Sequence, residues 1–300
     1  MDVSVIIINY NTRQMTAECI DSVFEKTKDI KFEIILVDNA STDGSKEFFE
    51  QDKRIIYIYN NENLGFGRAN NIGIEVAKGR NILFLNSDTL LINNAIKILS
   101  NYLDENPKVG ACGGNLYTKD LKPNHSYRLI FPSIMDEINT LFAKLPSKFI
   151  YGKNEEYNHT NKPLLVKYIT GADLMVRKNV LDDVGLFDPR FFMYFEETEL
   201  CHRFWENKYA IMSIPNAKII HLDGGSFNST DVVLSYKKRD KMYDDSKYKF
   251  YKKLHSVVYV YVIKSIELTC IYSRIFFYSI LNSPKKFFWI TKLKSIKEIL

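Results

Sequence analysis

The chain contains few cysteines, and no two of them lie close together in the sequence. The four are Cys19, Cys112, Cys201 and Cys270, and none belongs to a CxxC motif. This spacing argues against a disulfide framework and against a structural zinc site, and it is typical of a protein in a reducing compartment. The first residues lack a basic region followed by an apolar stretch, so we expect no secretory signal.

Long uncharged segments are missing as well. Between residues 236 and 300 the uncharged runs reach ten residues, as in 254–263, whereas a membrane-spanning helix needs about 20. Lys264, Glu267 and Arg274 interrupt the longer apolar stretches. We therefore do not expect the C-terminal region to cross a bilayer.

Charges of the two signs are unevenly distributed, although the formal net charge is only +5. Residues 1–235 hold 26 Lys and Arg against 31 Asp and Glu, whereas residues 236–300 hold 15 against 5. A basic region rich in aromatic residues favours amphipathic helices on an anionic membrane surface, with Tyr, Phe and Trp289 at the interface. The alternative is a helical appendage packed on the rest of the chain or on a second subunit, as in a homo-oligomer. No base-reading motif accompanies the basic clusters, so no nucleic-acid partner is expected.

Strand-like and helix-like segments alternate in the first part of the chain. Expected strands cover residues 3–8, 32–37, 55–59, 82–85 and 109–116, and expected helices cover residues 12–24, 43–50, 64–78 and 93–103. This alternation predicts an α/β fold with a mostly parallel sheet and right-handed crossovers.

The pattern changes after residue 116. Residues 117–163 contain four prolines and no regular period, so we expect an irregular segment there. Regular secondary structure is expected again at residues 164–169, and a helix is expected near 196–207. Two short strands are expected at 209–214 and 217–221.

Two of the expected strands are followed by aspartates. Asp38 directly follows the run 34–37, and Asp88 closes Asn86-Ser87-Asp88 after the run 82–85. Ligands of open α/β sheets bind at the carboxyl ends of the strands, so this pattern suggests a nucleotide site with a metal. The turn after Asp38 is rich in Ser and Thr, and a helix N-cap is the alternative role of this carboxylate.

The triplet Asn86-Ser87-Asp88 supplies oxygen ligands that suit Mg²⁺ or Mn²⁺. His221 ends an apolar segment and is a candidate second ligand, because imidazole suits Mn²⁺ better than Mg²⁺. Taken alone, a histidine at this place is more often structural, and this is the alternative role.

The segment 63–73 has glycines that allow a close backbone approach to a ligand, and its Arg68 can reach a phosphate or a sugar. It lacks the third glycine and the downstream acid of a dinucleotide fingerprint. The alternative is a plain helix start with an exposed arginine.

A second acidic cluster follows the aromatic residues 191–195. Its members are Glu196, Glu197 and Glu199. Burial beside aromatic rings raises the pKa of a carboxyl group and makes it a better proton acceptor. The alternative is an acidic first helical turn, which the helix dipole favours.

Seven short motifs occur in the order found in inverting family 2 glycosyltransferases. They are IIINYN, VDNASTDGS, NLGFGRANN, LFLNSD, TGADLMVRK, FFMYFEETELCHR and HLDGGS. Over about residues 1–230 the chain most resembles bacterial rhamnosyltransferases and related enzymes of cell-surface polysaccharide synthesis. The resemblance implies a GT-A fold in residues 1–230, with a donor nucleotide half at 1–116 and an acceptor half at 117–230. Residues 231–300 would form a helical region that associates with a membrane or a subunit.

The resemblance also implies a reaction and its residues. A sugar would pass with inversion from dTDP-rhamnose or a UDP-sugar to a glycan or lipid-linked acceptor. The basic, aromatic composition of residues 236–300 separately predicts a location at the cytoplasmic face of the cell membrane. Asn9, Tyr10, Asp38, Asn39, Arg68, Asn86, Ser87 and Asp88 would bind the donor, and Asp88 and His221 would hold Mn²⁺ or Mg²⁺. Gly171, Ala172 and Asp173 would line the sugar and acceptor pocket. Glu196 and Glu197 would form the catalytic acid pair, with Glu197 as the base.

The sequence departs from the family pattern at two positions. Asn86 replaces the first acid of the metal-binding triplet, which weakens metal affinity. Glu197 replaces the usual Asp, and the extra methylene moves the carboxylate by roughly 1–1.5 Å. Glu199 therefore stays a rival base.

Two other functions fit the same fold. A sugar nucleotidyltransferase normally has a glycine-rich, basic loop after the first strand, but residues 9–12 here read Asn-Tyr-Asn-Thr. A catalytically weak homologue acting as a binding or complex subunit would have lost the acids, which are present.

Overall fold

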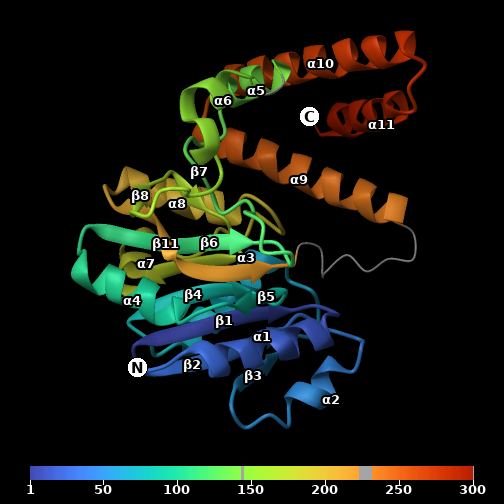
Figure 1. Cartoon of the computed structure of the whole chain (residues 1–300). Coiled ribbons are helices and arrows are strands. Elements are labelled where there is room, and N and C mark those ends of the chain that lie inside the picture. Colours follow the sequence, from blue (N-terminus) through green and yellow to red (C-terminus); the bar gives the residue numbers. More distant parts are fainter. Residues whose placement is uncertain (143–144, 223–231, 300) are drawn as a thin grey trace. The chain divides into compact units, whose positions relative to one another are not determined.

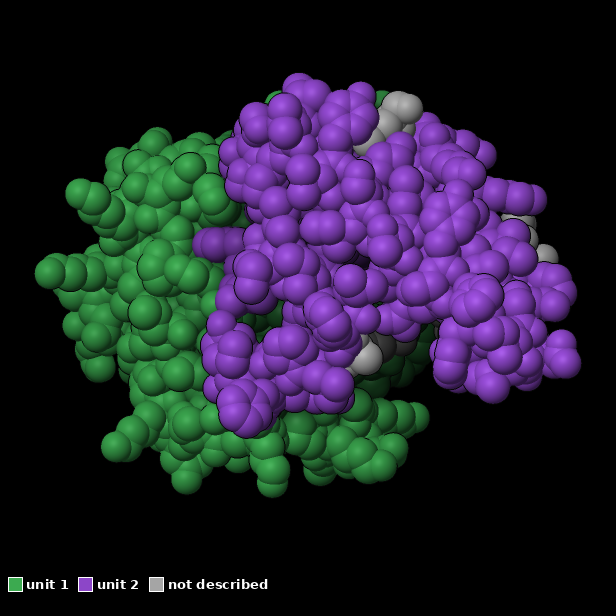
Figure 2. Space-filling view, turned by 90° about the horizontal axis from the view of Figure 1, so that it is seen from above, with its two compact units in different colours: residues 1–129, 153–192, 196–228 green, residues 130–152, 193–195, 229–300 purple. Residues whose placement is uncertain are grey.

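The structure is a computed structural model that describes residues 1–142, 145–222 and 232–299. The chain forms two compact units, shown in green and purple in Figure 2. Unit 1 comprises Met1–Leu129, Lys153–Phe192 and Glu196–Asn228, and unit 2 comprises Ile130–Gly152, Met193–Phe195 and Ser229–Leu300. The expected boundary between residues 230 and 231 lies outside the described residues, and the division into donor and acceptor halves stays a prediction.

Unit 1 is built on one large mixed sheet. Within the described residues it has nine strands: β1 (Val3–Asn9), β2 (Phe32–Asp38), β3 (Ile56–Tyr59), β4 (Asn81–Asn86), β5 (Thr89–Leu91), β6 (Val109–Tyr117), β8 (Leu164–Leu165), β10 (Asp173–Arg177) and β11 (Ala210–His221). The order is β3-β2-β1-β4-β10-β6-β11-β5, and β8 pairs with β11. The pairs β1–β2, β1–β4, β2–β3 and β6–β11 are parallel, whereas β10 runs antiparallel to β4 and β6. The predicted α/β architecture with a mostly parallel sheet is confirmed. A separate small sheet pairs β7 (Tyr127–Arg128) with β9 (Tyr168–Ile169).

Helices cover both faces of this sheet, as Figure 1 shows for α1 beside β1. They are α1 (Arg13–Lys26), α2 (Ser45–Phe49), α3 (Phe66–Val76), α4 (Ala95–Glu105), α7 (Lys178–Val184) and α8 (Glu196–Glu206). In β1, Val5 and Ile7 belong to the core that includes α1 and α4, whereas Ile6 faces α3. A Cβ on Gly73 of α3 would lie 2.6 Å from Ile6 Cγ2, so glycine is needed for this close approach. Burial on both faces explains why the strands read as continuous apolar runs.

The structure corrects two expectations about the second half of unit 1. Residues 209–214 and 217–221 were expected as two strands, but they form the single strand β11. Pro215 cannot donate to the strand ladder, and the pairing with β6 shifts register between Ser213 and Lys218. The irregularity is therefore a bulge inside one strand rather than a turn between two.

The second correction concerns residues 117–163, which were expected to be irregular. They contain α5 (Ile134–Leu141), α6 (Leu145–Tyr151) and a short 3₁₀ turn at Gly152–Asn154. The prolines lie outside these helices or in the first turn of α6, where a missing N–H costs no helical hydrogen bond.

Unit 2 is helical. It holds α5 and α6 together with α9 (Val232–Leu254), α10 (Val257–Ile280) and α11 (Lys285–Glu298), and α10 packs against both α5 and α11 (Figure 1). Among the described residues, no helix is long and apolar enough to span a membrane.

Charged side chains connect the helices of unit 2 in its interior. The buried Lys247 of α9 lies 3.2 Å from Glu137 Oε1 on α5 and 2.9 Å from Glu267 Oε2 on α10. Lys292 of α11 binds both carboxylate oxygens of the buried Asp244 at 2.9 and 3.0 Å. Among the helices described for unit 2, these ion pairs join α5, α9, α10 and α11 and fix their register.

Candidate functional site

The candidate site begins where three parallel strands of unit 1 end. Asn9, the last residue of β1, pairs in register with Asp38 at the end of β2, and its neighbour Ile8 pairs with Asn86 at the end of β4. The predicted donor-binding residues on these strands therefore share one edge of the sheet.

Asp38 is fully buried, and its carboxylate accepts three hydrogen bonds. It accepts from Asn9 Nδ2 at 3.0 Å, from the backbone N–H of Ser41 at 2.8 Å and from the Tyr57 hydroxyl at 3.3 Å. Burial, together with the charge of Asp38, raises the pKa of Tyr57 above its ordinary value. In this structure the carboxylate shapes the turn that follows β2 and has no surface facing solvent. Its contact with the nucleoside stays a prediction.

Asn9 organises the neighbouring helix start. Its Oδ1 accepts from the hydroxyls of Thr12 and Thr16, both at 2.9 Å, and Thr12 Oγ1 lies 3.2 Å from Ser87 Oγ. Sequence reasoning missed Thr12 and Thr16 as members of the site. The available signal was a pair of hydroxyls one helical turn apart, directly after a strand-end asparagine. The network links the end of β1 to the predicted metal triplet.

Of the predicted nucleoside contacts, Tyr10 is the exposed one. Asn39 is buried, and its amide joins two loops, because its Nδ2 donates to Gly65 O at 3.2 Å and its Oδ1 accepts from Asn60 at 2.8 Å. Gly65 has a φ of 81°, and a Cβ there would overlap the carbonyl oxygen of Phe192. The glycine is thus required by its positive φ and by the backbone beside it.

Arg68 is held by a backbone group of unit 1. Its Nε donates to Pro189 O at 2.9 Å, and the residue is otherwise exposed. This bond ties the Arg68 side chain to Pro189, which lies seven residues before Glu196 in the sequence. Its role in the donor pocket stays a prediction.

Asp88 and His221 come together as predicted. Thr89 pairs with His221 across β5 and β11, and the backbone N–H of Leu222 donates to Asp88 O at 2.9 Å. These contacts place His221 Nε2 at 3.3 Å from Asp88 Oδ1 and 3.4 Å from Asn86 Nδ2. Residues 223–226 of the motif HLDGGS lie outside the described residues.

The donor set at this point consists of one carboxylate and one imidazole. No group of three or more His, Cys, Asp or Glu side chains suited to a metal occurs in the part of the chain that the structure describes. The spacing of Asp88 and His221 suits two ligands of one divalent cation, and further ligands would have to come from the substrate. The residues fit a metal that is held jointly with a diphosphate.

Asp173 adds a third acid near this edge. It is fully buried, its Oδ2 accepts from Gly114 N at 2.6 Å, and its Oδ1 has no hydrogen-bond partner. Burial raises the pKa of Asp173 to about 7, and the hydrogen bond from Gly114 and the charge of His221 oppose this effect. A buried oxygen without a partner marks a place where a ligand's hydroxyl group can bind. The adjacent Ala172 is tied to the metal triplet, because its carbonyl accepts from Asn86 N at 3.0 Å.

The acid cluster occupies the first turn of α8, and its members differ. Glu199 is fully buried and forms a two-pronged ion pair with Arg203, at 2.9 Å from Nε to Oε1 and 3.0 Å from Nη2 to Oε2. Arg203 also donates to the carbonyls of Val184, Gly185 and Leu186. Glu199 thus anchors a loop and is bound on both oxygens.

Glu196 and Glu197 have environments that suit proton transfer. Burial and the charge of Glu197 raise the pKa of Glu196 well above its ordinary value, and its Oε2 has no hydrogen-bond partner. Burial also raises the pKa of Glu197, although hydrogen bonds from backbone N–H groups and a 3.4 Å contact from the Thr198 hydroxyl oppose this effect. The pair therefore contains one acid that holds its proton strongly and one that ionises first.

Gly171 lies beside Glu197. A Cβ there would be 3.5 Å from Phe66 Cε1 and 3.9 Å from Glu197 Cγ. The predicted pocket residues and the predicted base are thus neighbours, with Phe66 as a further wall that sequence reasoning did not single out. One indication of this role lay in the sequence: Phe66 follows Gly65 in the segment 63–73, whose glycines were expected to let the backbone approach a ligand closely.

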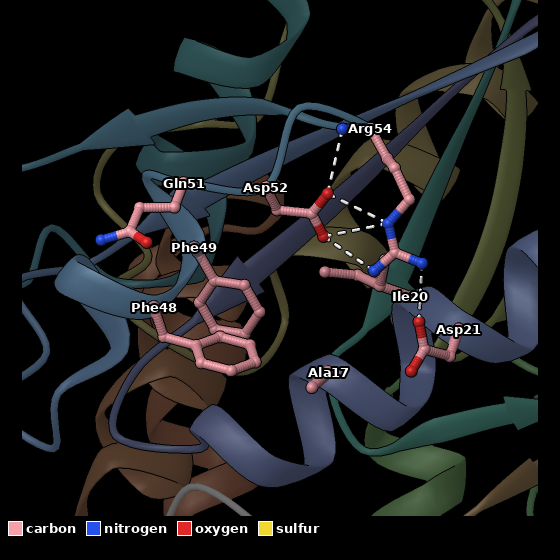
Figure 3. Close-up of a pocket in the computed structure, with 8 residues that line it drawn as sticks. All are labelled: Ala17, Ile20, Asp21, Phe48, Phe49, Gln51, Asp52 and Arg54. Atoms are coloured by element: carbon pink, nitrogen blue, oxygen red, sulfur yellow. Dashed lines mark hydrogen bonds and ion pairs between the residues drawn. The ribbon is translucent and has the colours of Figure 1, made fainter.

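A separate pocket lies between α1 and the segment after α2 (Figure 3). Ala17, Ile20, Asp21, Phe48, Phe49, Gln51, Asp52 and Arg54 line it. The Arg54 guanidinium is bound by Asp52 at 2.8 Å and by Asp21 at 2.9 Å. Two carboxylates already compensate this cation, and none of the predicted site residues lines the pocket.

Comparison with known proteins connects this geometry to a family. The family model described as "Glycosyl transferase family 2" matches residues 4–185. Glycosyltransferase GlyG of Streptococcus pneumoniae serotype 4 is 34% identical over 129 residues, which are 42% of this chain and 42% of that protein. The low-salt glycan biosynthesis hexosyltransferase Agl10 of Haloferax volcanii is 27% identical over 212 residues, which are 67% of this chain and 61% of that protein. The matches thus span about half the length of these curated relatives.

A solved structure shows the same fold. The crystal structure of GalNAc-T7 with UDP, GalNAc and Mn²⁺ superposes with a TM-score of 0.58 at 14% identity, covering 84% of this chain and 48% of that one. The predicted GT-A-like fold is confirmed by this likeness.

Proposed function

The chain belongs to glycosyl transferase family 2, and from this premise we propose that it transfers a sugar from a nucleotide-diphosphate donor to a glycan or lipid-linked acceptor, with inversion. The donor is dTDP-rhamnose or a UDP-sugar, and the product contributes to cell-surface polysaccharide, in line with the rhamnosyltransferase-like motif order. The similarity to Agl10 of Haloferax volcanii, a hexosyltransferase of low-salt glycan biosynthesis, supports the same substrate class.

The observation that carries this proposal is the convergence of Asp88 and His221 at the strand ends, 3.3 Å apart. A carboxylate and an imidazole at the carboxyl edge of an open α/β sheet suit a cation that also binds a diphosphate. Asp88, His221 and the amide oxygen of Asn86 would hold Mn²⁺ or Mg²⁺. When bound, this ion would neutralise negative charge on the departing nucleoside diphosphate.

The protein's own groups carry the remaining steps. Glu197 takes the proton from an acceptor hydroxyl, whose oxygen attacks the anomeric carbon of the donor. The bond from that carbon to the diphosphate oxygen breaks on the opposite face, and the nucleoside diphosphate leaves with the electron pair. Glu199 is disfavoured as the base because Arg203 binds both of its oxygens. Asp173 would accept a sugar or acceptor hydroxyl through its unpartnered Oδ1.

We further propose that unit 2 associates with the cytoplasmic face of the cell membrane. Large apolar side chains are exposed on four of its helices, with Met135 at 67%, Phe149 at 93%, Val258 at 73%, Phe276 at 70% and Phe287 at 63%. The exposed apolar residues of α5 and α6 extend the surface beyond the region expected from the sequence. Lys285 and Lys286 supply positive charge beside Phe287, which suits anionic lipid headgroups.

A turnover assay tests the enzymatic proposal. The full chain is incubated with dTDP-rhamnose or UDP-sugars, Mn²⁺ and lipid-linked acceptors, and the anomeric configuration of the product is determined by NMR. We expect inverted product from one donor class and loss of turnover in Asp88→Asn, with the exposed Asp120→Asn as control. Nucleotide–sugar synthesis from a sugar phosphate would favour the nucleotidyltransferase alternative. Donor binding without turnover for any acceptor would favour the binding subunit.

Vesicle flotation tests the membrane proposal. We expect the protein to float with vesicles that contain phosphatidylglycerol, and Phe149→Glu combined with Phe276→Glu to remain unbound. Phe48→Glu, at a phenylalanine of unit 1 that is 53% exposed, is the control. Equal flotation of all three proteins would remove the membrane proposal.

A further inference from the structure

The buried face of α1 carries a row of polar side chains. Thr12, Thr16, Cys19 and Ser22 follow one another at helical spacing, so they lie on one side of α1, and all four are buried. A helix face that packs against a sheet is normally apolar, because a buried polar group costs stability unless it is hydrogen-bonded. Each side chain of the row has polar partners, and all of them belong to unit 1.

The first partner of the row is the residue before Asp88. Thr12 is the N-cap residue of α1, yet its side chain makes no capping hydrogen bond to the helix. Its Oγ1 instead donates to Asn9 Oδ1 at 2.9 Å and lies 3.2 Å from Ser87 Oγ. Thr16 donates to the same asparagine oxygen at 2.9 Å. Helix α1 therefore connects the end of β1 to the predicted metal triplet.

The second partner is the backbone around Asp88 itself. The hydroxyl of Thr89, the next residue, donates to the carbonyl oxygen of Asn86 at 2.7 Å. The Cys19 thiol lies 3.5 Å from this carbonyl oxygen and 3.5 Å from the Thr89 hydroxyl. These contacts hold the backbone from Asn86 to Thr89 as a short loop against α1. Asp88 lies inside this loop, so the direction of its side chain depends on them.

The same face of α1 also holds β5, the strand beside His221. One turn farther along the helix, Ser22 Oγ accepts from the backbone N–H of Leu91 at 3.1 Å. At the other end of β5, Thr89 pairs with His221 of β11. Both predicted metal ligands thus depend on backbone that α1 secures. Asp88 lies between two residues whose hydroxyls contact α1 side chains, and His221 pairs with one of these two residues.

We propose that Thr12 and Thr89 are positioning residues, which hold the backbone around Asp88 in the conformation that binds the divalent cation. This inference rests on the proposed function in assigning Asp88 and His221 to the metal. Because Asn86 stands where the family has an acid, the triplet offers a single carboxylate, and metal affinity then depends on how well the ligands are prearranged. Loss of a supporting contact behind a metal ligand typically costs about 10–100-fold in affinity.

The test compares variants of the full chain that each lose one buried hydroxyl. Thr12→Val and Thr89→Val remove the two proposed contacts and keep the branched shape of the side chain. Ser100→Ala is the matched control within unit 1. Ser100 is also buried and accepts from Asn81 Nδ2 at 3.0 Å, but Asn81 begins β4 at the end opposite to Asn86. Thr89→Ser keeps the hydroxyl and should behave as the wild type.

Calorimetric titration of UDP and dTDP at a series of Mn²⁺ concentrations gives the Mn²⁺ concentration at which nucleotide binding is half-maximal. We expect this concentration to rise about 10–100-fold in Thr12→Val and Thr89→Val, and less than twofold in Ser100→Ala and Thr89→Ser. Excess Mn²⁺ should restore nucleotide binding to the wild-type level, because the variants misplace a metal ligand without removing it.

Hydrogen–deuterium exchange without ligand provides a second readout. We expect faster exchange of the amides of residues 86–89 in both valine variants and not in Ser100→Ala, with the other strands of unit 1 unchanged. An unchanged Mn²⁺ requirement in both valine variants would overturn the inference, as would a loss of nucleotide binding that excess Mn²⁺ does not restore. Failure of the proposed function looks different, because the wild type would then bind neither nucleotide at any Mn²⁺ concentration.

Discussion

The two units place their polar and apolar side chains in opposite ways. In unit 1 the sheet interior is apolar, and buried polar groups such as Asn9, Asp38 and Asp173 collect at one edge. In unit 2 the charges of Lys247 and Glu267 lie inside, whereas Phe149 is 93% exposed. The difference fits the proposed ligand site in unit 1, whereas in unit 2 the buried charges connect the helices to one another.

The energetics of the two arrangements also differ. The apolar sheet of unit 1 gains stability from area removed from water, which leaves its strand ends available for chemistry. Buried ion pairs contribute little net stability, but loss of one partner is costly because it leaves an uncompensated charge. Unit 2 is thus expected to tolerate surface changes and to respond strongly to single changes in its charged interior.

The largest expected effect separates the two acids of unit 1. Glu197→Gln should lower kcat by about 10²–10⁴-fold, since a positioned general base contributes that much. Glu196→Gln should retain most activity, because the raised pKa of Glu196 keeps it protonated and the amide replaces a neutral group. Steady-state kinetics with a saturating donor measure both. A greater loss in Glu196→Gln than in Glu197→Gln would reverse the roles of the two acids.

The second prediction concerns the free energy of unfolding of unit 2. Lys247→Ala leaves Glu137 and Glu267 buried without their cation, which should cost about 3–5 kcal/mol. Lys241→Ala breaks an exposed pair with Glu298 and should cost about 0–1 kcal/mol. Urea unfolding followed by circular dichroism gives both values. Similar costs for the two variants would show that the charged interior does not fix the helices.

The next effect is a pH dependence in unit 1. A base works only when ionised, and burial raises the pKa of Glu197 above its ordinary value of 4.5. Activity should therefore fall as the pH drops, and the midpoint of this decrease in kcat/KM should lie above 4.5, with about a tenfold loss per pH unit below it. Profiles of kcat/KM from pH 4 to 9 measure the midpoint. A flat profile down to the ordinary pKa of glutamate would argue against a buried base.

The smallest effect concerns the surface of unit 2. Changing Lys285 and Lys286 to Gln should weaken binding to anionic vesicles by about 1 kcal/mol for each charge removed. The same change at Lys31 and Lys53, two exposed lysines of unit 1, should have no effect. Sedimentation with vesicles of increasing phosphatidylglycerol content compares the pairs. Equal losses would mean that net charge alone, and not unit 2, determines binding.

Much of unit 1 was predictable because its signals are local. The strands β1, β2 and β4 are continuous apolar runs. Asp38 ends β2 and Asp88 follows β4, and these two aspartates led to the prediction of a ligand site at this edge. The pairing of Asp88 with His221 was predicted from the motif order, although more than 130 residues separate the two. The proposed choice of Glu197 over Glu199 as the base needed the structure, because the ion pair between Arg203 and Glu199 is one of several possible helical pairs.

Unit 2 was less predictable because its contacts are distant in sequence. The helices α5 and α6 were missed, since the prolines of residues 117–163 hid two short helical patterns. No local signal joins Lys247 to Glu137, because such contacts depend on how whole helices pack. The single strand β11 was divided for a related reason, since Pro215 reads as a break unless its partner strand is known.

Binding of nucleoside diphosphates tests the central claim most directly. Isothermal titration calorimetry would compare UDP and dTDP, with Mn²⁺, Mg²⁺ or a chelator, on the wild type, Asp88→Asn and Asp120→Asn. We predict that one nucleotide binds the wild type and Asp120→Asn in the presence of the metal, and that Asp88→Asn or chelation weakens binding at least tenfold, or about 1.4 kcal/mol. Equal affinity in all three proteins with and without metal, or no binding of either nucleotide, would contradict a donor site at the strand ends.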